Sequence, residues 1–409
     1  MTPIKMYDAY QSYADLSHPV RTLALNSERI LRLWSASQFA SPLRRMTAYY
    51  ELVSLSGFTH TRPDYEIENV TTNGGDVVNV VETAVLATPF CTLLRFSREG
   101  GGSQPRVLLV APMSGHFATL LRGTIRTLLR DNEVYVTDWR NTRDIPIDKG
   151  VFGLDDFAQH LIDFITFMGP QSHVVAVCQP VVAALTAVAV MAENNDPAQP
   201  ASLTLMAGPI DTRVSPTKVN ELATSKPIEW FREKLIGVVP RSFPGAGRRV
   251  YPGFLQLAAF MSMNINRHSK AFVNLFKSRL EGDFEKADQI RAFYKEYFAI
   301  MDLDAEFYLQ TIELVFQKNA LPEGKLLFKG RPVVPRAIKK TFLLTVEGER
   351  DDICAVGQTL AAQDLCSGLR PYMKSQHMQP GVGHYGVFSG RRWDNQVYPV
   401  VRAHIQSSI

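Results

Sequence analysis

Three side chains that together can perform acyl transfer lie far apart in the chain, in the order Cys178, Asp351 and His384. A thiolate attacks an ester carbonyl as a nucleophile. An imidazole can take the thiol proton and later deliver it to the leaving alcohol. A carboxylate orients that imidazole and stabilises its charged form without taking the proton itself. These residue types predict ester chemistry through an acyl-cysteine intermediate.

The residues around Cys178 favour its role as the nucleophile. Residues 174–177 (V-V-A-V) indicate a buried strand, and the Ala-rich residues 181–192 indicate a buried helix with Pro180 in its first turn. A strand that turns abruptly into a helix, with the cysteine at the turn, is typical of a nucleophile elbow. A helix N-terminus and a nearby imidazole both favour the thiolate. A purely structural buried cysteine is the alternative.

The same stretch must also be weighed as a membrane span. Residues 174–192 carry no charge, and this run just reaches the roughly 18 apolar residues that a span requires. Gln179 and Pro180 interrupt the run, and its pattern changes from strand to helix between them. We therefore expect no membrane span here.

Asp351 and His384 each follow a predicted strand. Asp351 lies after residues 341–348 in G-E-R-D-D, and His384 lies after residues 372–379 in G-V-G-H-Y-G. In an open α/β sheet the carboxyl ends of the strands form the binding edge. The order nucleophile, acid, histidine is that of the α/β-hydrolases. Asp352 is the alternative acid, with Asp351 then a helix cap, but the turn spacing favours Asp351.

Backbone N–H groups are expected to hold the oxyanion of the tetrahedral intermediate. One is the N–H of Gln179, directly after the nucleophile, and the other comes from Met113 or Ser114 after the predicted strand 107–113. His116 lies close to this loop in the sequence, and we expect it to line the pocket.

Strands and helices alternate through much of the chain, which indicates βαβ units and a mostly parallel sheet. The predicted strands are 107–113, 134–139, 174–177, 202–211, 341–348 and 372–379, and the predicted helices are 115–132, 154–169, 181–192, 357–366 and 392–407. The predicted fold class is therefore α/β: a sheet of the α/β-hydrolase type, flanked by helices, with an inserted and mainly helical lid.

The alternation divides the chain into four predicted parts. They are an N-terminal helical packing extension (1–65), a first part of the core (66–213), a helical lid (214–338) and a second part of the core (339–409). The lid region is rich in Phe, Tyr and Trp, which is typical of a cover over an apolar substrate, although the same aromatics could form the core of the lid itself.

Composition excludes several classes of protein. The 409 residues include 44 basic and 40 acidic side chains without a long run of one sign, so nucleic acid is not an expected partner. The N-terminal segment lacks the apolar core of a secretory signal. The four cysteines are widely spaced, without a metal-ligand pattern. We expect a cytoplasmic protein without a metal or a cofactor.

Five segments resemble those of intracellular poly(3-hydroxybutyrate) depolymerases, a branch of the α/β-hydrolases near the polyhydroxyalkanoate synthases. They are APMSGHFATLLR, VVAVCQPVVAAL, RRVYPGFLQ, TVEGERDDI and GHYGVFSGRRW. The similarity runs from about residue 40 to the C-terminus. Its most specific part is the C-Q-P elbow, in which Ala176 and Pro180 stand where most hydrolases of this fold have the glycines of G-x-S-x-G.

The resemblance implies a function and a site. The family's cysteine nucleophile, aspartate and histidine fall on Cys178, Asp351 and His384. The implied reaction is hydrolysis of a stored polyester, at the surface of cytoplasmic granules, to 3-hydroxybutyrate oligomers and monomer. A homo-oligomer is an assembly that the sequence allows.

Two other functions remain open. An acyltransferase of the same fold would form the same covalent intermediate and pass it to another acceptor, such as coenzyme A or a growing polyester. Synthases usually keep G-x-C-x-G, which this chain lacks, so hydrolysis is favoured. The second alternative is a non-catalytic granule-associated protein, and the intact triad counts against it.

Overall fold

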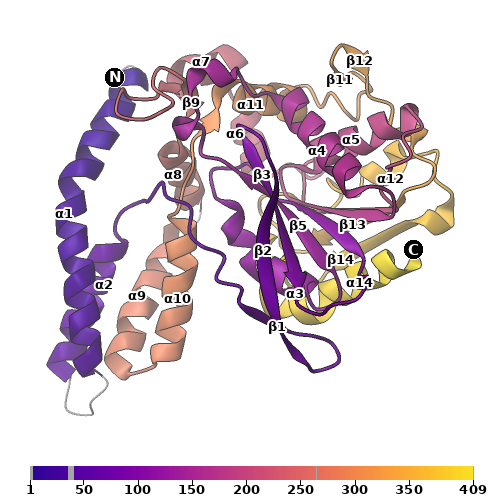
Figure 1. Ribbon diagram of the computed structural model, residues 1–409. Helices are drawn as coiled ribbons and strands as arrows, with labels where there is room; N and C mark the ends of the chain where they lie inside the picture. Colours follow the sequence, from indigo (N-terminus) through magenta and orange to yellow (C-terminus); the bar gives the residue numbers. More distant parts are fainter. Residues whose placement is uncertain (1–2, 36–40, 264, 409) are drawn as a thin grey trace.

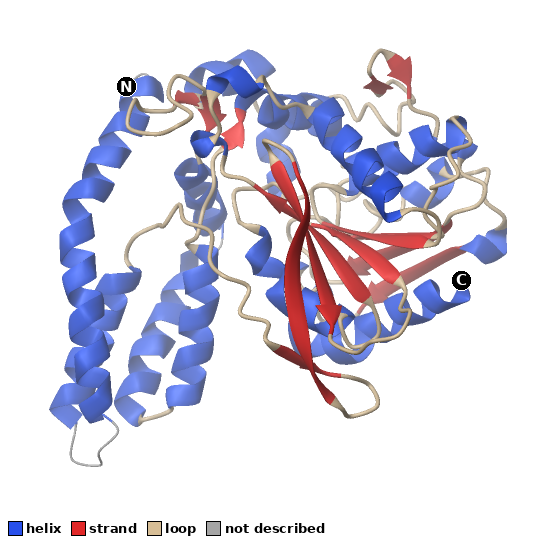
Figure 2. Ribbon diagram, in the orientation of Figure 1, coloured by secondary structure: helices blue, strands red, loops and turns tan. Residues whose placement is uncertain are grey.

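A twisted mixed β-sheet forms the centre of the molecule in the computed structural model, which describes residues 3–35, 41–263 and 265–408 (Figures 1 and 2). Within these residues the sheet has nine strands, in the spatial order β1-β2-β3-β5-β4-β6-β7-β13-β14. Their bounds are β1 Asn69–Thr71, β2 Val77–Ala87, β3 Cys91–Arg98, β4 Arg106–Val110, β5 Glu133–Trp139, β6 Ser172–Val177, β7 Ser202–Met206, β13 Phe342–Gly348 and β14 Lys374–Gln379. Strands β1 to β3 are antiparallel to their neighbours, and the strands from β5 to β14 are parallel.

Helices cover both faces of the sheet because its central strands are apolar on both sides (Figure 1). Every residue of β6 and β7 is buried, and so are most residues of helix α5. The helices that cover the two faces are α3 Arg122–Leu128, α4 Leu154–Met168, α5 Val181–Glu193, α12 Ala362–Leu365, α13 Gly390–Arg392 and α14 Tyr398–Ser407. None of the helices in the described ranges has both the length and the hydropathy of a membrane span.

The strand order confirms the predicted α/β-hydrolase fold. The strand before Cys178 is central, and the strands before Asp351 and His384 follow it toward one edge. Some predicted elements are shorter in the structure. Strand β4 ends at Val110 instead of 113, and the predicted helix 115–132 is a 3₁₀ turn, Ala118–Leu121, followed by α3.

The predicted helix 357–366 is wrong over most of its length, because only the four residues of α12 are α-helical. The cause is Glu347, a carboxylate at the end of β13. It accepts hydrogen bonds from the backbone N–H groups of Gly357, Thr359 and Leu360 at 2.8–3.0 Å. These N–H groups are held by a side chain, so the segment forms turns. The last predicted helix, 392–407, is likewise divided into a π-helical turn, Trp393–Val397, and α14.

The N-terminal residues form a helical hairpin that stands beside the sheet (Figure 1). Helix α1 spans Pro3–Ser35 and α2 spans Ser41–Leu55, both within the predicted helical extension 1–65. The hairpin packs against α9 (Ile265–Glu281), which packs against α10 (Phe284–Tyr297). We call these four helices the arm.

A buried ion-pair network joins the four helices of the arm. Glu28 on α1 and Glu51 on α2 have fully buried carboxylates. The guanidinium group of Arg279 on α9 makes two hydrogen bonds to Glu51, each 2.7 Å long. Arg291 on α10 contacts Glu28 at 3.1 Å and Glu51 at 3.5 Å. Each charge therefore has a partner on another helix, as buried ions require.

The start of α1 is fixed to the base of another helix through one buried carboxylate. The hydroxyl of Tyr7 donates a hydrogen bond to Asp302 Oδ2, and the backbone N–H of Gly253 donates one to Asp302 Oδ1 at 2.8 Å. Gly253 is the first residue of α8 (Gly253–Met263). The position of α8 thus depends on the first helix of the chain.

Residues 214–338 lie over the carboxyl ends of the parallel strands and are mainly helical, with short strands among the helices (Figure 2). Besides α8, α9 and α10, this region contains α6 Lys218–Thr224, α7 Ile228–Lys234, β8 Gly237–Val238, β9 Arg249–Tyr251, β10 Leu303–Asp304, α11 Ala305–Gln310, a π-helical turn Thr311–Gln317, β11 Leu327–Phe328, β12 Arg331–Pro332 and a 3₁₀ turn Pro335–Ala337.

Candidate active site

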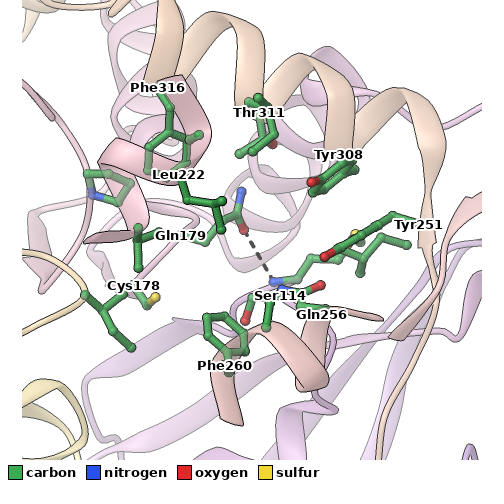
Figure 3. A pocket seen from close by; sticks show the side chains of 18 of the residues that line it. Ser114, Cys178, Gln179, Leu222, Tyr251, Gln256, Phe260, Tyr308, Thr311 and Phe316 are labelled. Carbon is green, nitrogen blue, oxygen red and sulfur yellow. Dashed lines mark hydrogen bonds between the residues drawn. The ribbon is translucent and has the colours of Figure 1, made fainter. Parts of the chain in front are cut away.

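Cys178 lies at a sharp turn between β6 and α5. Its φ angle is +67°, a left-handed conformation that costs a residue other than glycine about 1–3 kcal/mol. Its N–H donates to the carbonyl of Met206 on β7 at 2.8 Å, and its carbonyl accepts from the N–H of Val181 at 3.3 Å. The thiol side chain is partly exposed at the edge of a pocket (Figure 3). A strained residue at the turn from a strand into a helix is typical of a nucleophile elbow.

The close packing that the elbow needs is provided by Gly208, which follows β7. A Cβ atom at this position would overlap with the carbonyl oxygen of Cys178 and with the side chain of Val181. In most hydrolases of the fold, glycines on either side of the nucleophile relieve such crowding. Here Ala176 and Pro180 occupy those positions, and Gly208, just after the neighbouring strand, has this role.

The structure brings Asp351 and His384 into direct contact. Nδ1 of His384 lies 2.8 Å from Oδ2 of Asp351. The other oxygen of Asp351 accepts hydrogen bonds from the N–H groups of Ile353 at 2.9 Å and Cys354 at 2.8 Å. The carboxylate is therefore fully buried and fully hydrogen-bonded. Asp352, the alternative acid, is exposed and lines a second pocket.

Cys178 acts together with Asp351 on the pKa of His384. Burial lowers the pKa of His384, but the negative charges of Cys178 and Asp351 and the hydrogen bonds to both outweigh burial. The net pKa of His384 is raised well above its ordinary value. Asp351 contacts the imidazole directly, and Asp351 and Cys178 both favour its charged form.

Sequence reasoning missed Glu347, which shapes the loop around the acid. Glu347 accepts hydrogen bonds from three N–H groups of the loop 357–360. This loop places the hydroxyl of Thr359 against Gly208, where it accepts from the N–H at 2.8 Å and donates to the carbonyl at 2.9 Å. The loop after β13 is therefore fixed to the elbow itself. A signal was present, because a glutamate within the apolar strand T-V-E-G must find partners if it is buried.

The predicted oxyanion donors lie beside Cys178. Gln179, Met113 and Ser114 all line the pocket that contains the thiol. The N–H of Met113 donates a long hydrogen bond of 3.4 Å to the side-chain oxygen of Gln179 (Figure 3). The N–H of Met113 thus already donates to an amide oxygen, as it would donate to the carbonyl oxygen of a bound substrate.

The pocket next to Cys178 has a volume of about 170 Å³ and mostly apolar walls. Helices and turns from residues 214–338 form most of it, including Leu222, Phe260 and Phe316 (Figure 3). The rings of Tyr251 and Tyr308 stack at 3.8 Å on one side. We call this cavity the acyl pocket.

His116 does not line the acyl pocket, contrary to the position expected for it. Its ring is buried between Phe260, at a centroid distance of 6.3 Å, and Tyr297, at 4.9 Å. Burial lowers the pKa of His116 to about 4, so the ring is neutral near pH 7. His116 therefore lies behind the wall formed by Phe260.

The other cysteines are poor candidates for the nucleophile. Cys91, Cys354 and Cys366 are buried, whereas Cys178 is partly exposed. Burial raises the pKa of Cys91 and Cys354 well above the ordinary value and that of Cys366 to about 12. Among the described residues, no group of His, Cys, Asp and Glu side chains has the arrangement of a metal site.

Comparisons with known proteins point to one family. Residues 207–408 match the family model described as "PHB de-polymerase C-terminus". The chain resembles the PHB depolymerases. The segment similar to these depolymerases contains Asp351, His384 and much of the acyl pocket, whereas Cys178 precedes it. No curated protein sequence matches the chain significantly.

Solved structures are similar at the level of the fold. One is a thermophilic esterase from Thermogutta terrifontis, 16% identical, with a TM-score of 0.41 over 81% of this chain and 99% of that one. Another is the 2-hydroxy-6-oxo-6-phenylhexa-2,4-dienoate hydrolase from Rhodococcus sp. strain RHA1, 16% identical, with a TM-score of 0.44 over 80% of this chain and 99% of that one. At these scores the similarities add nothing to the resemblance to PHB depolymerases.

Proposed function

We propose that this protein is an intracellular depolymerase that hydrolyses stored poly(3-hydroxybutyrate) to 3-hydroxybutyrate oligomers and monomer. The observation that carries the proposal is the series Cys178–His384–Asp351, with the cysteine on a strained elbow beside an apolar pocket. The match of residues 207–408 to the depolymerase model supports the polyester as the substrate class.

The first half of the reaction forms the acyl-enzyme. Sγ of Cys178 attacks the ester carbonyl carbon while His384 holds the thiol proton. The ester C–O bond then breaks, the alcohol oxygen takes the proton from His384, and the acyl group remains as a thioester on Cys178. Asp351 keeps the imidazole in orientation and balances its positive charge.

The second half consumes one water molecule. His384 takes a proton from water as the water oxygen attacks the thioester carbonyl, and it returns that proton to the sulfur as the C–S bond breaks. In both halves the oxyanion is held by the N–H of Gln179 and by that of Met113 or Ser114. The side chain of Gln179 must then give up its long bond to Met113 when Met113 is the second donor.

The surroundings of the triad suit a methyl-bearing polyester. The acyl pocket offers mostly apolar walls, and Ser114 and Gln179 add polar groups to the wall that contains Cys178. We propose that residues 214–338 act as a lid over this substrate, with residues 1–65 as a packing extension. We further propose action in the cytoplasm at the granule surface, with no cofactor.

The test is release of 3-hydroxybutyrate from amorphous polymer granules by the wild type, by Cys178→Ala and by Cys366→Ala. Cys366 is a matched control because it is buried and lines no described pocket. We expect release by the wild type and by Cys366→Ala, and none by Cys178→Ala. Equal release by all three would exclude the cysteine mechanism.

Two alternative functions give different results in the same assay. An acyltransferase would cleave activated esters but would need coenzyme A or a hydroxyl acceptor to release product. A non-catalytic granule protein would show no burst of acylation with an activated ester. Mass spectrometry of the wild type after such a burst locates the acyl group, which we expect on Cys178.

A further inference from the structure

A second cavity lies beside His384 and next to the acyl pocket. It has a volume of about 320 Å³, and His384 is part of its wall, whereas Cys178 is part of the wall of the acyl pocket. Phe260 and Ile353 line both cavities, so the two share a boundary next to the triad. We call the second cavity the leaving-group pocket, for the reason that follows.

The chemistry of the triad assigns the two sides of a bound ester. The carbonyl carbon must reach the sulfur of Cys178, and the alcohol oxygen must reach the imidazole that protonates it. The acyl segment therefore extends from Cys178, and the alcohol segment extends past His384. In this arrangement the cavity walled by His384 receives the alcohol segment.

The alcohol segment of a 3-hydroxyalkanoate polyester has a fixed polarity. Each unit is a hydroxy acid esterified through its hydroxyl group, so the departing alcohol always runs toward the carboxyl end of the chain. When the cleaved bond is close to that end, the segment in the leaving-group pocket carries a free carboxylate. A chain interior or a carboxyl ester in the same place carries no charge.

A cation lies in this pocket. Arg267, near the start of α9, lines the cavity and is exposed to it. In the described part of the chain we find no carboxylate at ion-pair distance from Arg267. Its charge reaches the aromatic wall, because burial raises the pKa of Tyr385 and of Tyr297 while Arg267 lowers both. Tyr385 is the residue directly after His384.

We propose that the leaving-group pocket binds the carboxylate end of short 3-hydroxyalkanoate oligomers, and that Arg267 is the residue that pairs with this carboxylate. The inference rests on the proposed function and extends it, since it gives the enzyme a preference for bonds near the carboxyl end. Arg267 is a specificity-determining residue here and takes no part in bond cleavage. A guanidinium group suits this role because it can form two hydrogen bonds to one carboxylate.

Replacing Asp352 should change the binding of a carboxylate ligand in the opposite direction to replacing Arg267. This exposed carboxylate lines the same pocket and repels an anionic ligand. If the ligand is a carboxylate, removing the charge of Asp352 strengthens its binding, and removing the charge of Arg267 weakens it. If the pocket only accommodates neutral polymer, neither charge matters.

The experiment compares linear 3-hydroxybutyrate dimer and trimer, each as the free acid and as the methyl ester, at neutral pH. For Arg267→Gln we expect KM for the free acids to rise about three- to fivefold, because an ion pair with the exposed Arg267 is weak in water. We expect kcat, and both parameters for the methyl esters, to be almost unchanged. Arg267→Lys should restore part of the loss, and Asp352→Asn should lower KM for the free acids only.

Each result separates this inference from the proposed function. Equal effects of Arg267→Gln on acid and methyl ester, or no effect on either, would overturn the carboxylate pocket while leaving the hydrolase intact. Normal kinetics with the methyl esters show that the variant is folded. Failure of the wild type to cleave any of the four substrates, with activated esters still cleaved, would overturn the proposed function and this inference with it.

Discussion

Nδ1 of His384 lies 2.8 Å from Oδ2 of Asp351, across the gap between the loops that follow two adjacent parallel strands. The contact depends on the sheet, because β13 and β14 pair in register and end side by side. A backbone hydrogen bond also joins the same loops, because the N–H of Arg350 donates to the carbonyl of Val382 at 2.8 Å. Both side chains are therefore positioned by backbone that is fixed on both sides.

Replacing each of the two neighbouring aspartates should identify the triad acid. We expect Asp351→Asn to lower kcat about 10³- to 10⁴-fold with an activated ester, because the imidazole loses the carboxylate that orients it. Asp352→Asn should keep kcat within about threefold, in line with an exposed position. Steady-state kinetics of both variants give the answer, and a larger loss in Asp352→Asn would reverse the assignment.

The protonation of His384 should depend on the sulfur. Burial lowers the pKa of His384, but the charge of Cys178 and its hydrogen bond are among the causes that raise the net pKa well above the ordinary value. Cys178→Ala removes both, so we expect the imidazole to titrate at lower pH in this variant than in the wild type. NMR titration of the ring protons measures the difference. Identical midpoints would mean that the sulfur and the ring do not interact.

The same shift has a consequence for stability. A histidine whose pKa is raised on folding stabilises the protein fully below its unfolded pKa of about 6.5, and this stabilisation is lost as the pH rises through the folded pKa. Asp351→Asn removes one cause of the shift. The loss in free energy of unfolding should thus be larger at pH 6 than at a pH above the folded value. Thermal unfolding across this pH range tests the sign, and a loss that grows with pH would contradict it.

Gly208 should tolerate no side chain. In Gly208→Ala the new Cβ overlaps with the carbonyl oxygen of Cys178, so the elbow must move. We expect a destabilisation of about 1–3 kcal/mol and a lower kcat. Gly123→Ala is the control, because Gly123 lies in α3 with open space around it, and it should be neutral or stabilising. Equal stability and equal kcat of the two variants would show that the elbow can accommodate a Cβ atom at position 208.

The hydroxyl of Tyr7 should contribute to stability. Tyr7→Phe leaves Oδ2 of the fully buried Asp302 without its donor, which costs about 1–3 kcal/mol. Tyr13→Phe is a matched change on the same helix at a side chain that is 66% exposed, and it should alter stability by less than about 0.5 kcal/mol. The unfolding midpoints of the two variants should differ by several degrees in the direction of a less stable Tyr7→Phe.

The sequence was most informative where a local pattern decides the structure. An uncharged β-branched run followed by an alanine-rich run can hardly form anything other than β6 and α5, so the elbow and its cysteine could be located from the sequence alone. The order of the three triad residues then predicted the fold, because acid and histidine must follow later strands of the same sheet.

The features that were missed depend on contacts between distant residues. Nothing in the segment 357–366 reveals that Glu347 captures its N–H groups, and nothing near the elbow reveals that Gly208 supplies its space. His116 was expected in the pocket from its position in the sequence, but the ring of Phe260 stands in front of it. The sequence could not associate Arg267 with His384, because the two residues are far apart in the chain and come together only through the folded position of α9.

Two glutamates on α1 and α2 pair with two arginines on α9 and α10. These ion pairs link the beginning of the chain to the helices of the proposed leaving-group pocket. A fragment that begins at residue 56 would lose both glutamates and leave Arg279 and Arg291 without these buried partners. Helices α9 and α10 carry Arg267 and Tyr297 of the leaving-group pocket, whereas the triad stands on the sheet. A fragment without the first two helices should therefore no longer distinguish one end of an oligomer from the other. Because the position of α8 depends on Tyr7, it should also react more slowly with small activated esters.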